Sequence, residues 1–482
     1  MNLSARLMAA TAGAVLLAAT PVSAQTVISA YVNQYYAPET NPELSAVTEE
    51  LVAEYEAEHP DVDIQLIPHI ADVNAYQAWL TTRFTAGDEP DIAWQQFYQR
   101  NSERGDNWLA LNAYLDAPNP YAGAGEPGSE RWIDIFFENV LAQIRAGDGN
   151  WYQVNTNWVE TGFYVNEDML SENGVDISRW QDWGDMIDTC RQLREKGIQP
   201  IGVFMTPEWS TYQWLDDIIV TGAFADVMQS WYLEKYNNEY LPWRQLNPEE
   251  FAKAVKEGKF SVEDPRFDTY LQLTKDMADN CLVEGFAGIP EYDTLFNMFY
   301  NEQVAMVWLG SWSAPSLEDV PFSVGSGYMP PFSREDSPYA IHDTSYRVGG
   351  PSSSGQFGLT ARTAERGTAE IAIDFLQFFT APQNYARIAA ADSGYIPVIE
   401  GVEPPAVATA FQEIAQLPER GLTDPIGRLN QQFGTEHNRL MQSFMLGEID
   451  AEQLKGQYQR ALDRAVEDMC FENEAEWTWC AE

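Results

Sequence analysis

Residues 27–66, VISAYVNQYYAPETNPELSAVTEELVAEYEAEHPDVDIQL, combine two hydrophobic patterns that together indicate the fold class. The stretch opens with an apolar run typical of a buried strand and closes with alternating apolar positions over 62–66. Between them, apolar residues recur at helical spacing after Asn41 and Pro42, a pair that suits a helix start. A further helix and a third strand continue this order as far as Trp94. The alternation predicts a parallel sheet wrapped in helices.

The length and the N-terminus predict an exported protein of two domains. A chain of 482 residues is too long for one comfortable core. Residues 1–24 carry one positive charge, a short apolar run and a Val-Ser-Ala end, typical of a signal peptide cut after Ala24. No cysteine stands at the cleavage point, so we expect no lipid anchor. No later apolar run reaches the roughly 18 residues that a membrane-spanning helix needs.

The charge balance limits the possible partners. With 28 basic and 73 acidic residues, the formal net charge is −45. Such a chain repels nucleic acid and anionic membranes, and it offers little cationic chemistry for phosphate or carboxylate ligands. The four histidines are scattered singly, so we expect no metal site and no cofactor.

Four cysteines, an even number, permit two disulfides in an oxidising compartment. Three pairings are possible. The close spacing of Cys470 and Cys480 favours a C-terminal disulfide, which leaves Cys190 to pair with Cys281.

Four later segments carry a resemblance to a known family. They are DGNWYQVNTNWVETGFYVNEDMLSENGVD at 148–176, RWQDWGDMIDTCRQL at 179–193, YNEQVAMVWLGSW at 300–312 and AIDFLQFFTAPQNYARIAAADSGYIPV at 372–398. In order and separation they resemble the extracellular solute-binding proteins of bacterial ABC importers, in the maltose-binding-like group for sugars.

The resemblance implies a two-lobed periplasmic-binding-protein fold of the α/β class. Each lobe would be a mainly parallel sheet flanked by helices, and the C-terminal region would be helical. We expect a signal peptide at 1–24, an N-terminal lobe at 25–157 plus 350–398, and a C-terminal lobe at 158–349 plus 399–482. The chain would cross between lobes near 155–158, 349–350 and 398–402.

The resemblance also implies a function. A monomeric periplasmic protein without catalytic activity would capture a neutral sugar or oligosaccharide between hinged lobes and deliver it to the membrane subunits of an ABC permease.

Ligands of open α/β sheets bind at the carboxyl ends of strands, and this rule selects candidate residues. Aromatic rings suit the apolar faces of a sugar, and planar polar side chains suit its hydroxyls. The predicted ligand-binding residues are Trp312, Trp209, Glu208, Trp158, Asn157, Tyr36, Gln95, Gln96, Tyr395 and Arg347.

The segment WLGSWSAP, 308–315, supplies the strongest candidate. Gly310 and Ser311 would let the backbone turn at the end of a strand, so that Trp312 could lie flat against the cleft. Trp308 is still within the strand, and we expect it in the core.

Two rival functions remain open. A secreted glycoside hydrolase needs two carboxylates at a fixed separation, but acidic residues are so abundant here that pairs prove nothing. Motifs of other hydrolases, such as G-x-S-x-G and H-E-x-x-H, are absent from the sequence. The same fold could instead bind a cation such as a polyamine, because aromatic rings and carboxylates also suit amines.

Overall fold

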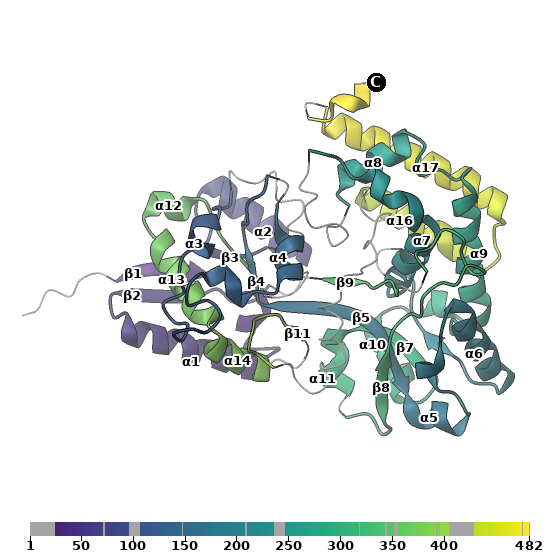
Figure 1. Cartoon of the computed structure of the whole chain (residues 1–482), viewed down its shortest axis with the longest axis horizontal. Helices are drawn as coiled ribbons and strands as arrows, with labels where there is room; N and C mark the ends of the chain where they lie inside the picture. Colours follow the sequence, from purple (N-terminus) through teal and green to yellow (C-terminus); the bar gives the residue numbers. More distant parts are fainter. Residues whose placement is uncertain are drawn as a thin grey trace, which may run out of the picture.

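The structure is a computed structural model of the chain. It describes residues 25–70, 73–95, 107–146, 148–207, 210–235, 246–317, 319–342, 345–350, 355–391, 394, 396–403, 429–474 and 476–481. Two sheets, each packed with helices, form two lobes that lie side by side (Figure 1). No helix within the described ranges is both long and apolar enough to cross a bilayer.

The first lobe is built on a five-stranded sheet in the order β2-β1-β3-β10-β4. Its strands β1 and β2 pair in parallel, as do β1 and β3, whereas β10 runs antiparallel to both β3 and β4. The strands are β1 (Thr26–Ala30), β2 (Val62–Leu66), β3 (Ile92–Trp94), β4 (Val154–Asn155) and β10 (Gln356–Leu359). The predicted parallel βαβ start is therefore confirmed.

Helices cover the first sheet, and the start of α1 follows the expected cap chemistry. The side chain of Asn41 accepts a hydrogen bond from the backbone of Leu44, and Pro42 occupies the first turn. The longer helices are α1 (Pro42–Glu58), α2 (Val73–Ala86), α13 (Ala369–Thr380) and α14 (Pro382–Ala391). The shorter ones are η1 (Asn33–Tyr36), α3 (Asn112–Leu115), η3 (Trp132–Ile135), α4 (Glu138–Ile144) and α12 (Arg362–Arg366).

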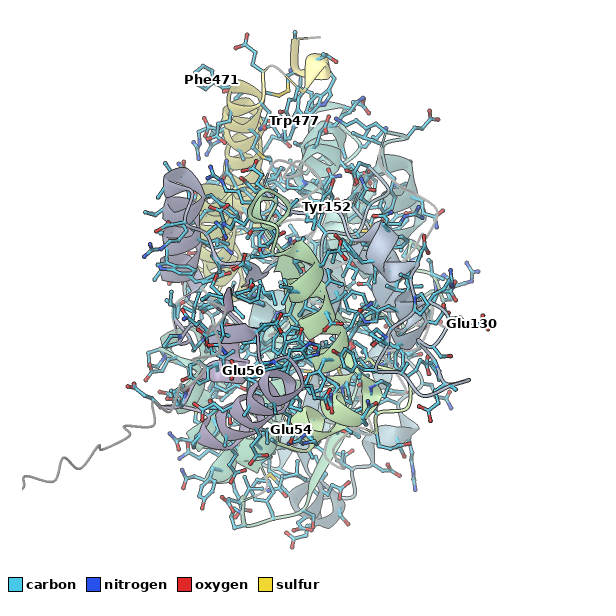
Figure 2. All side chains as sticks on the ribbon, turned by 90° about the vertical axis from the view of Figure 1, so that its left-hand side faces the viewer. Glu54, Glu56, Glu130, Tyr152, Phe471 and Trp477 are labelled. Carbon is cyan, nitrogen blue, oxygen red and sulfur yellow. A yellow bond between two sulfur atoms is a disulfide. The ribbon has the colours of Figure 1, made fainter. Side chains whose placement is uncertain are left out.

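Acidic side chains lie on the outside of the first lobe. Glu54 on α1 and Glu130 are exposed, and Figure 2 looks onto this side of the molecule. Glu54 forms an ion pair with Arg387 at 2.8 Å. Exposed carboxylates such as these are solvated by water, and an exposed ion pair of this kind adds little stability.

The second lobe is built around the ten-residue strand β5. Strands β7, β8, β9 and β11 all pair antiparallel with β5, whereas β6 pairs in parallel with β7. The strands are β5 (Asn157–Asn166), β6 (Ile201–Gly202), β7 (Met306–Gly310), β8 (Val324–Gly327), β9 (Gly349–Gly350) and β11 (Ile396–Pro397). The α/β class is confirmed, but this sheet is more antiparallel than the expected mainly parallel one, because several connections return to one shared central strand.

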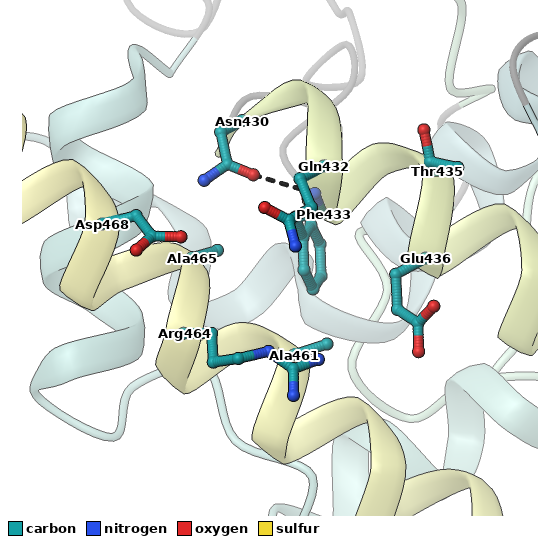
Figure 3. A pocket seen from close by; sticks show the side chains of 9 residues that line it. All are labelled: Asn430, Gln432, Phe433, Thr435, Glu436, Ala461, Arg464, Ala465 and Asp468. Atoms are coloured by element: carbon teal, nitrogen blue, oxygen red, sulfur yellow. Dashed lines mark hydrogen bonds between the residues drawn. The ribbon is translucent and has the colours of Figure 1, made fainter.

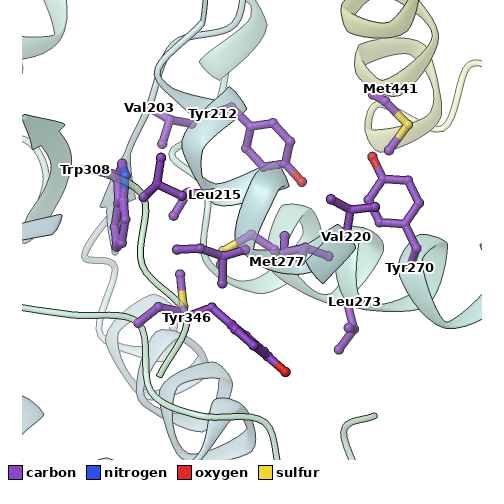
Figure 4. Close-up of a cluster of buried hydrophobic side chains, with 14 of the residues drawn as sticks. Val203, Tyr212, Leu215, Val220, Tyr270, Leu273, Met277, Trp308, Tyr346 and Met441 are labelled. Carbon is purple, nitrogen blue, oxygen red and sulfur yellow. The ribbon is translucent and has the colours of Figure 1, made fainter. Parts of the chain in front are cut away.

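The helices of the second lobe enclose a large apolar core. Trp308 is 1% exposed and lies among the core side chains, as expected (Figure 4). Its ring meets that of Phe163 edge-to-face, with centroids 4.7 Å apart. The helices are α5 (Glu167–Glu172), η4 (Ile177–Arg179), α6 (Trp183–Glu195), α7 (Tyr212–Met228), η5 (Gln229–Trp231), α8 (Pro248–Lys256), α9 (Pro265–Asn280), η6 (Phe286–Gly288), α10 (Tyr292–Tyr300), η7 (Ser311–Ser313), α11 (Ala314–Leu317), α16 (Gln431–Met445), α17 (Ala451–Glu472) and η9 (Thr478–Ala481).

Both disulfides form with the expected pairing. Cys190 on α6 bonds to Cys281 at the end of α9, and Cys470 near the end of α17 bonds to Cys480. Both therefore lie in the second lobe.

The chain passes between the two sheets three times, and the three crossing segments contact one another at Thr156. Strand β4 leads through Thr156 directly into β5, and Figure 1 shows β5 extending from one lobe to the other. The backbone of Thr156 bonds to Gly355, which precedes β10, and to Val398, which follows β11. The three crossings are thus linked by backbone hydrogen bonds at one point.

Candidate functional site

Trp312 lies at the carboxyl end of β7, where the second sheet meets the region of the crossings. It belongs to the short helix η7 and is only partly buried, whereas the preceding strand is buried throughout. A partly exposed indole between buried segments provides a flat apolar surface for a ligand.

Gly310 positions this indole in a way that the sequence did not indicate. Its backbone is extended, with φ −89° and ψ 161°, so the turn begins after it, at Ser311. A Cβ at position 310 would lie 2.1 Å from Cζ3 of Trp312. The residue is therefore a glycine because the indole lies directly over its Cα, and the expectation that it provides a turn is corrected.

Two further aromatic residues fix the orientation of Trp312. The ring of Trp214, near the start of α7, meets Trp312 edge-to-face with centroids 5.5 Å apart. The hydroxyl of Tyr292 pairs with that of Ser313. Burial raises the pKa of Tyr292, and a hydrogen bond with the Trp312 side chain opposes part of this rise. The indole is thus held at its edge while part of its surface stays accessible.

The loop before α7 is held by helix α16. Asn438 donates a hydrogen bond to the carbonyl of Pro207 at 3.2 Å, and Gln442 donates to that of Met205 at 3.0 Å. Within the loop, the hydroxyl of Ser210 donates to the carbonyl of Phe204. These bonds fix the chain that leads to Trp214.

Buried residues anchor α16 in turn. His437 contacts Asp216 of α7 at 3.0 Å through Nε2 and the hydroxyl of Tyr458 on α17 at 2.8 Å through Nδ1. Tyr270 of α9 donates to the other carboxylate oxygen of Asp216 at 2.7 Å. Four helices therefore share one buried polar cluster, and the loop is held by a rigid support.

Four residues with amide side chains lie at the ends of neighbouring strands of the first sheet, on the side where the chain crosses to the second lobe. Asn33 follows β1, Gln95 follows β3, Gln356 begins β10, and Asn155 ends β4. These strands are neighbours in the sheet order, and all four residues are at most 4% exposed. Asn33 has a positive φ of 52°, a conformation that non-glycine residues adopt mainly at special sites. These four residues are polar and uncharged.

Asn157 occupies the centre of the crossing region. Its amide nitrogen donates to the hydroxyl of Tyr35 at 2.7 Å, and its amide oxygen accepts from the backbone of Gly355 at 3.1 Å. The Tyr35 hydroxyl also contacts Tyr385 at 2.8 Å. The structure therefore places Asn157 in a buried network at the crossings, and contact with a ligand stays a prediction.

The other described candidates are dispersed around this region. Trp158 is fully buried and donates its indole N–H to Glu160 at 2.9 Å. Arg347 is partly exposed, with its guanidinium 3.9 Å from the ring centroid of Tyr328. Tyr36 is partly exposed, and burial together with nearby Glu49 raises its pKa.

Four of the predicted ligand-binding residues, Gln96, Glu208, Trp209 and Tyr395, lie outside the described residues. Sequence reasoning missed Trp214, Gln356 and Asn438. Trp214 stands a few residues after the candidates Glu208 and Trp209 and could have been found by this proximity, but the other two become relevant only through contacts between distant elements.

Two surface pockets lie away from this region. One, of about 310 Å³, lies between α16 and α17 and is lined by Asn430, Phe433, Glu436, Arg464 and Asp468, among others (Figure 3). The other lies beside α5 and η4. Neither includes a strand-end residue of the first lobe or Trp312, and among the described residues no group of three His, Cys, Asp or Glu could hold a metal ion.

The family of the chain follows from its sequence profile. The profile of the bacterial extracellular solute-binding protein family matches residues 50–417, so the chain belongs to this family. The family is one of solute-binding proteins and not of enzymes. No curated protein sequence matches this chain significantly.

Solved structures share the fold. The apo form of RafE from Streptococcus pneumoniae aligns with 93% of this chain and 100% of its own, at a TM-score of 0.63 and 16% identity. RafE in complex with raffinose aligns with 92% of this chain and 100% of its own, at a TM-score of 0.60 and 17% identity. A chitin oligosaccharide binding protein aligns with 92% of this chain and 99% of its own, at a TM-score of 0.61 and 20% identity. At these identities the likeness establishes the two-lobed architecture alone.

Proposed function

We propose that this chain is the substrate-binding component of an ABC importer and captures a neutral sugar or oligosaccharide between its two lobes. The observation that carries the proposal is the partly exposed indole of Trp312, held over Gly310 at a strand end beside the crossings. Flat aromatic surfaces suit the C–H faces of sugars. Two similar structures belong to proteins described as binding raffinose and chitin oligosaccharides, which supports the ligand class.

The mechanism that we propose is hinge closure. The lobes that we propose comprise 25–157 plus 350–398 and 158–349 plus 399–482. The bound near 350 is supported by the pairing of β9 with β5 of the second sheet and of β10 with β4 of the first. Ligand contacts on both lobes favour the closed form, because only differential affinity for that form can drive closure. The closed protein then docks on the membrane subunits of the permease.

The proposal includes the setting in which the protein works. It is a periplasmic monomer without a lipid anchor, and it releases its ligand chemically unchanged. The predicted signal peptide, the disulfides and membership of an extracellular family support the exported location.

A thermal-shift screen tests the ligand class. Raffinose, N,N′-diacetylchitobiose and D-galactose are compared with spermidine, and a ligand that binds the folded state raises the unfolding midpoint. We expect a shift with at least one sugar and none with spermidine. A shift with spermidine alone would replace the sugar by a cationic ligand, and turnover of the bound oligosaccharide would contradict a binding function.

A further inference from the structure

Asn33, Gln95, Gln356 and Asn155 form a row of amides at the end of the first sheet, which we call the amide row. Within it, the side chain of Gln356 has unused hydrogen-bonding capacity at both of its polar atoms. It is 0% exposed, and neither Oε1 nor Nε2 has a hydrogen-bond partner within the part of the chain that the structure describes. Most buried polar groups in proteins are paired, and leaving one unpaired costs about 1–3 kcal/mol. An amide with two unpaired atoms therefore requires an explanation.

A third open atom, on Gln153, lies on the same face of the sheet. Asn155 stands opposite Gln356 in the β4–β10 pairing, so their side chains share a face. Gln153, two residues before Asn155, shares that face too, and its Nε2 donates to Asn155 at 2.9 Å. The Oε1 of Gln153 is buried without a described partner. The other face carries the core residues Val154 and Phe357.

These open atoms are two acceptors and one donor. A sugar hydroxyl both donates and accepts, so adjacent hydroxyls can satisfy all three. An ammonium group only donates, and it would leave Nε2 of Gln356 unsatisfied. A carboxylate or phosphate only accepts, and it would leave both amide oxygens unsatisfied. The chemistry therefore fits neutral hydroxyl groups.

The position suits contact with a ligand that enters between the lobes. Gln356 directly follows Gly355, which bonds to Thr156 and Asn157 at the crossings. The neighbouring Gln95 bonds to the backbone of Gln356 at 3.0 Å. If the lobes pivot at the crossings, as the proposed hinge closure requires, the surroundings of Gln356 change with that motion.

We infer that Gln356, together with Oε1 of Gln153, is a specificity-determining hydrogen-bonding site for the hydroxyl groups of the sugar. This inference rests on the proposed function. It assigns discrimination between neutral hydroxylated ligands and amines to the first lobe, whereas Trp312 of the second lobe supplies apolar contact.

The substitution Gln356→Met tests the inference because it keeps the length of the side chain and removes both polar atoms. Removal of unpaired buried atoms raises the thermal midpoint of the ligand-free protein. Titration calorimetry with whichever of raffinose, diacetylchitobiose or galactose binds the wild type should show at least a tenfold loss of affinity. The matched control is Gln377→Met, since Gln377 is buried on α13 and donates to Pro118 at 3.4 Å. It should lower the midpoint and leave the affinity unchanged.

Three outcomes are decisive. A lower midpoint for Gln356→Met would show that the amide is paired in the folded protein and would overturn the inference. A higher midpoint with unchanged sugar affinity would show that the amide serves internal water, and would also overturn it. Failure of the wild type to bind any of the three sugars would instead contradict the proposed function, and the midpoint of Gln356→Met would still report whether the amide is unpaired.

Discussion

The two sides of the crossing region differ in their chemistry. The second lobe presents an aromatic residue, Trp312, supported by Trp214 and lying over Gly310. The first lobe has a row of buried amides at the end of its sheet near the crossings, and within this row both polar side-chain atoms of Gln356 lack a described partner. A sugar has apolar faces and a belt of hydroxyls, so the difference suggests a division of labour in which one lobe stacks and the other forms hydrogen bonds. Four predictions test the second lobe, which is the aromatic side of this contrast, in order of expected effect.

The largest expected effect is on stability and concerns the two disulfides, which both lie in the second lobe. Cys190 and Cys281 are separated by 91 residues, and Cys470 and Cys480 by 10. By loop-closure entropy, replacing the first pair with alanine costs about 4.5 kcal/mol and replacing the second about 2.7 kcal/mol. Urea unfolding followed by tryptophan fluorescence measures both. Equal losses for the two pairs would contradict the entropic explanation.

The second effect concerns stacking. Trp312→Ala removes an indole worth about 3 kcal/mol of contact, which corresponds to a loss of about 100-fold in sugar affinity. Because Trp312 is partly exposed, the thermal midpoint should fall only slightly. Titration calorimetry gives the affinity, and Trp312→Phe, which keeps a flat ring, should recover part of it. Unchanged affinity in the alanine variant would remove Trp312 from the site.

The third effect tests the close approach of Gly310 and Trp312. Gly310→Ala places a Cβ where the indole lies, although alanine tolerates the backbone angles at this position. The indole must move, and we expect a loss of about tenfold in affinity, or about 1.4 kcal/mol. Gly434→Ala is the control, because a Cβ there meets no atom within 4 Å.

A double variant makes this third test sharper. In the Trp312→Ala background, Gly310→Ala should have little further effect on affinity, because the group that it displaces is gone. Additive losses would show that Gly310 acts through something other than the indole.

The smallest expected effect comes from the support of the loop before α7. Asn438→Ala removes the hydrogen bond to Pro207, worth about 1 kcal/mol, so sugar affinity should fall by a few fold. Asn301→Ala removes a similar amide-to-carbonyl bond at the exposed end of α10 and should leave affinity unchanged. Stopped-flow binding should place the change in dissociation. Equal affinity for the two variants would limit Asn438 to a role in stability.

Much of the aromatic side could be predicted from the sequence. Trp308 was expected in the core and Trp312 outside it, and the structure buries the first and partly exposes the second. The Gly-Ser pair that follows the apolar run makes this distinction visible, because the end of a strand is a local feature. The sequence did not show why residue 310 is a glycine. The indole of Trp312 packs back onto the backbone at this position, and hydrophobic periodicity does not encode such a contact.

The amide side was only partly predictable. Gln95 follows a strand and was selected on that ground, whereas Gln356 begins a strand and was passed over. The rule about carboxyl ends assumes parallel strands, and β10 runs antiparallel to its neighbours, so its amino end lies at the same edge. Strand direction is a property of the assembled sheet.

By itself, the sequence determined the α/β class, the order of strands and helices as far as Trp94, and the cysteine pairing that it favoured, because hydrophobic periodicity, helix caps and short spacings act over a few residues. Only the tertiary structure decided which strands run antiparallel, which distant segments meet at Thr156, and which buried amide has no partner among the described residues. Those features depend on contacts between residues far apart in the chain, such as Asn155 and Gln356, and local patterns carry no information about them.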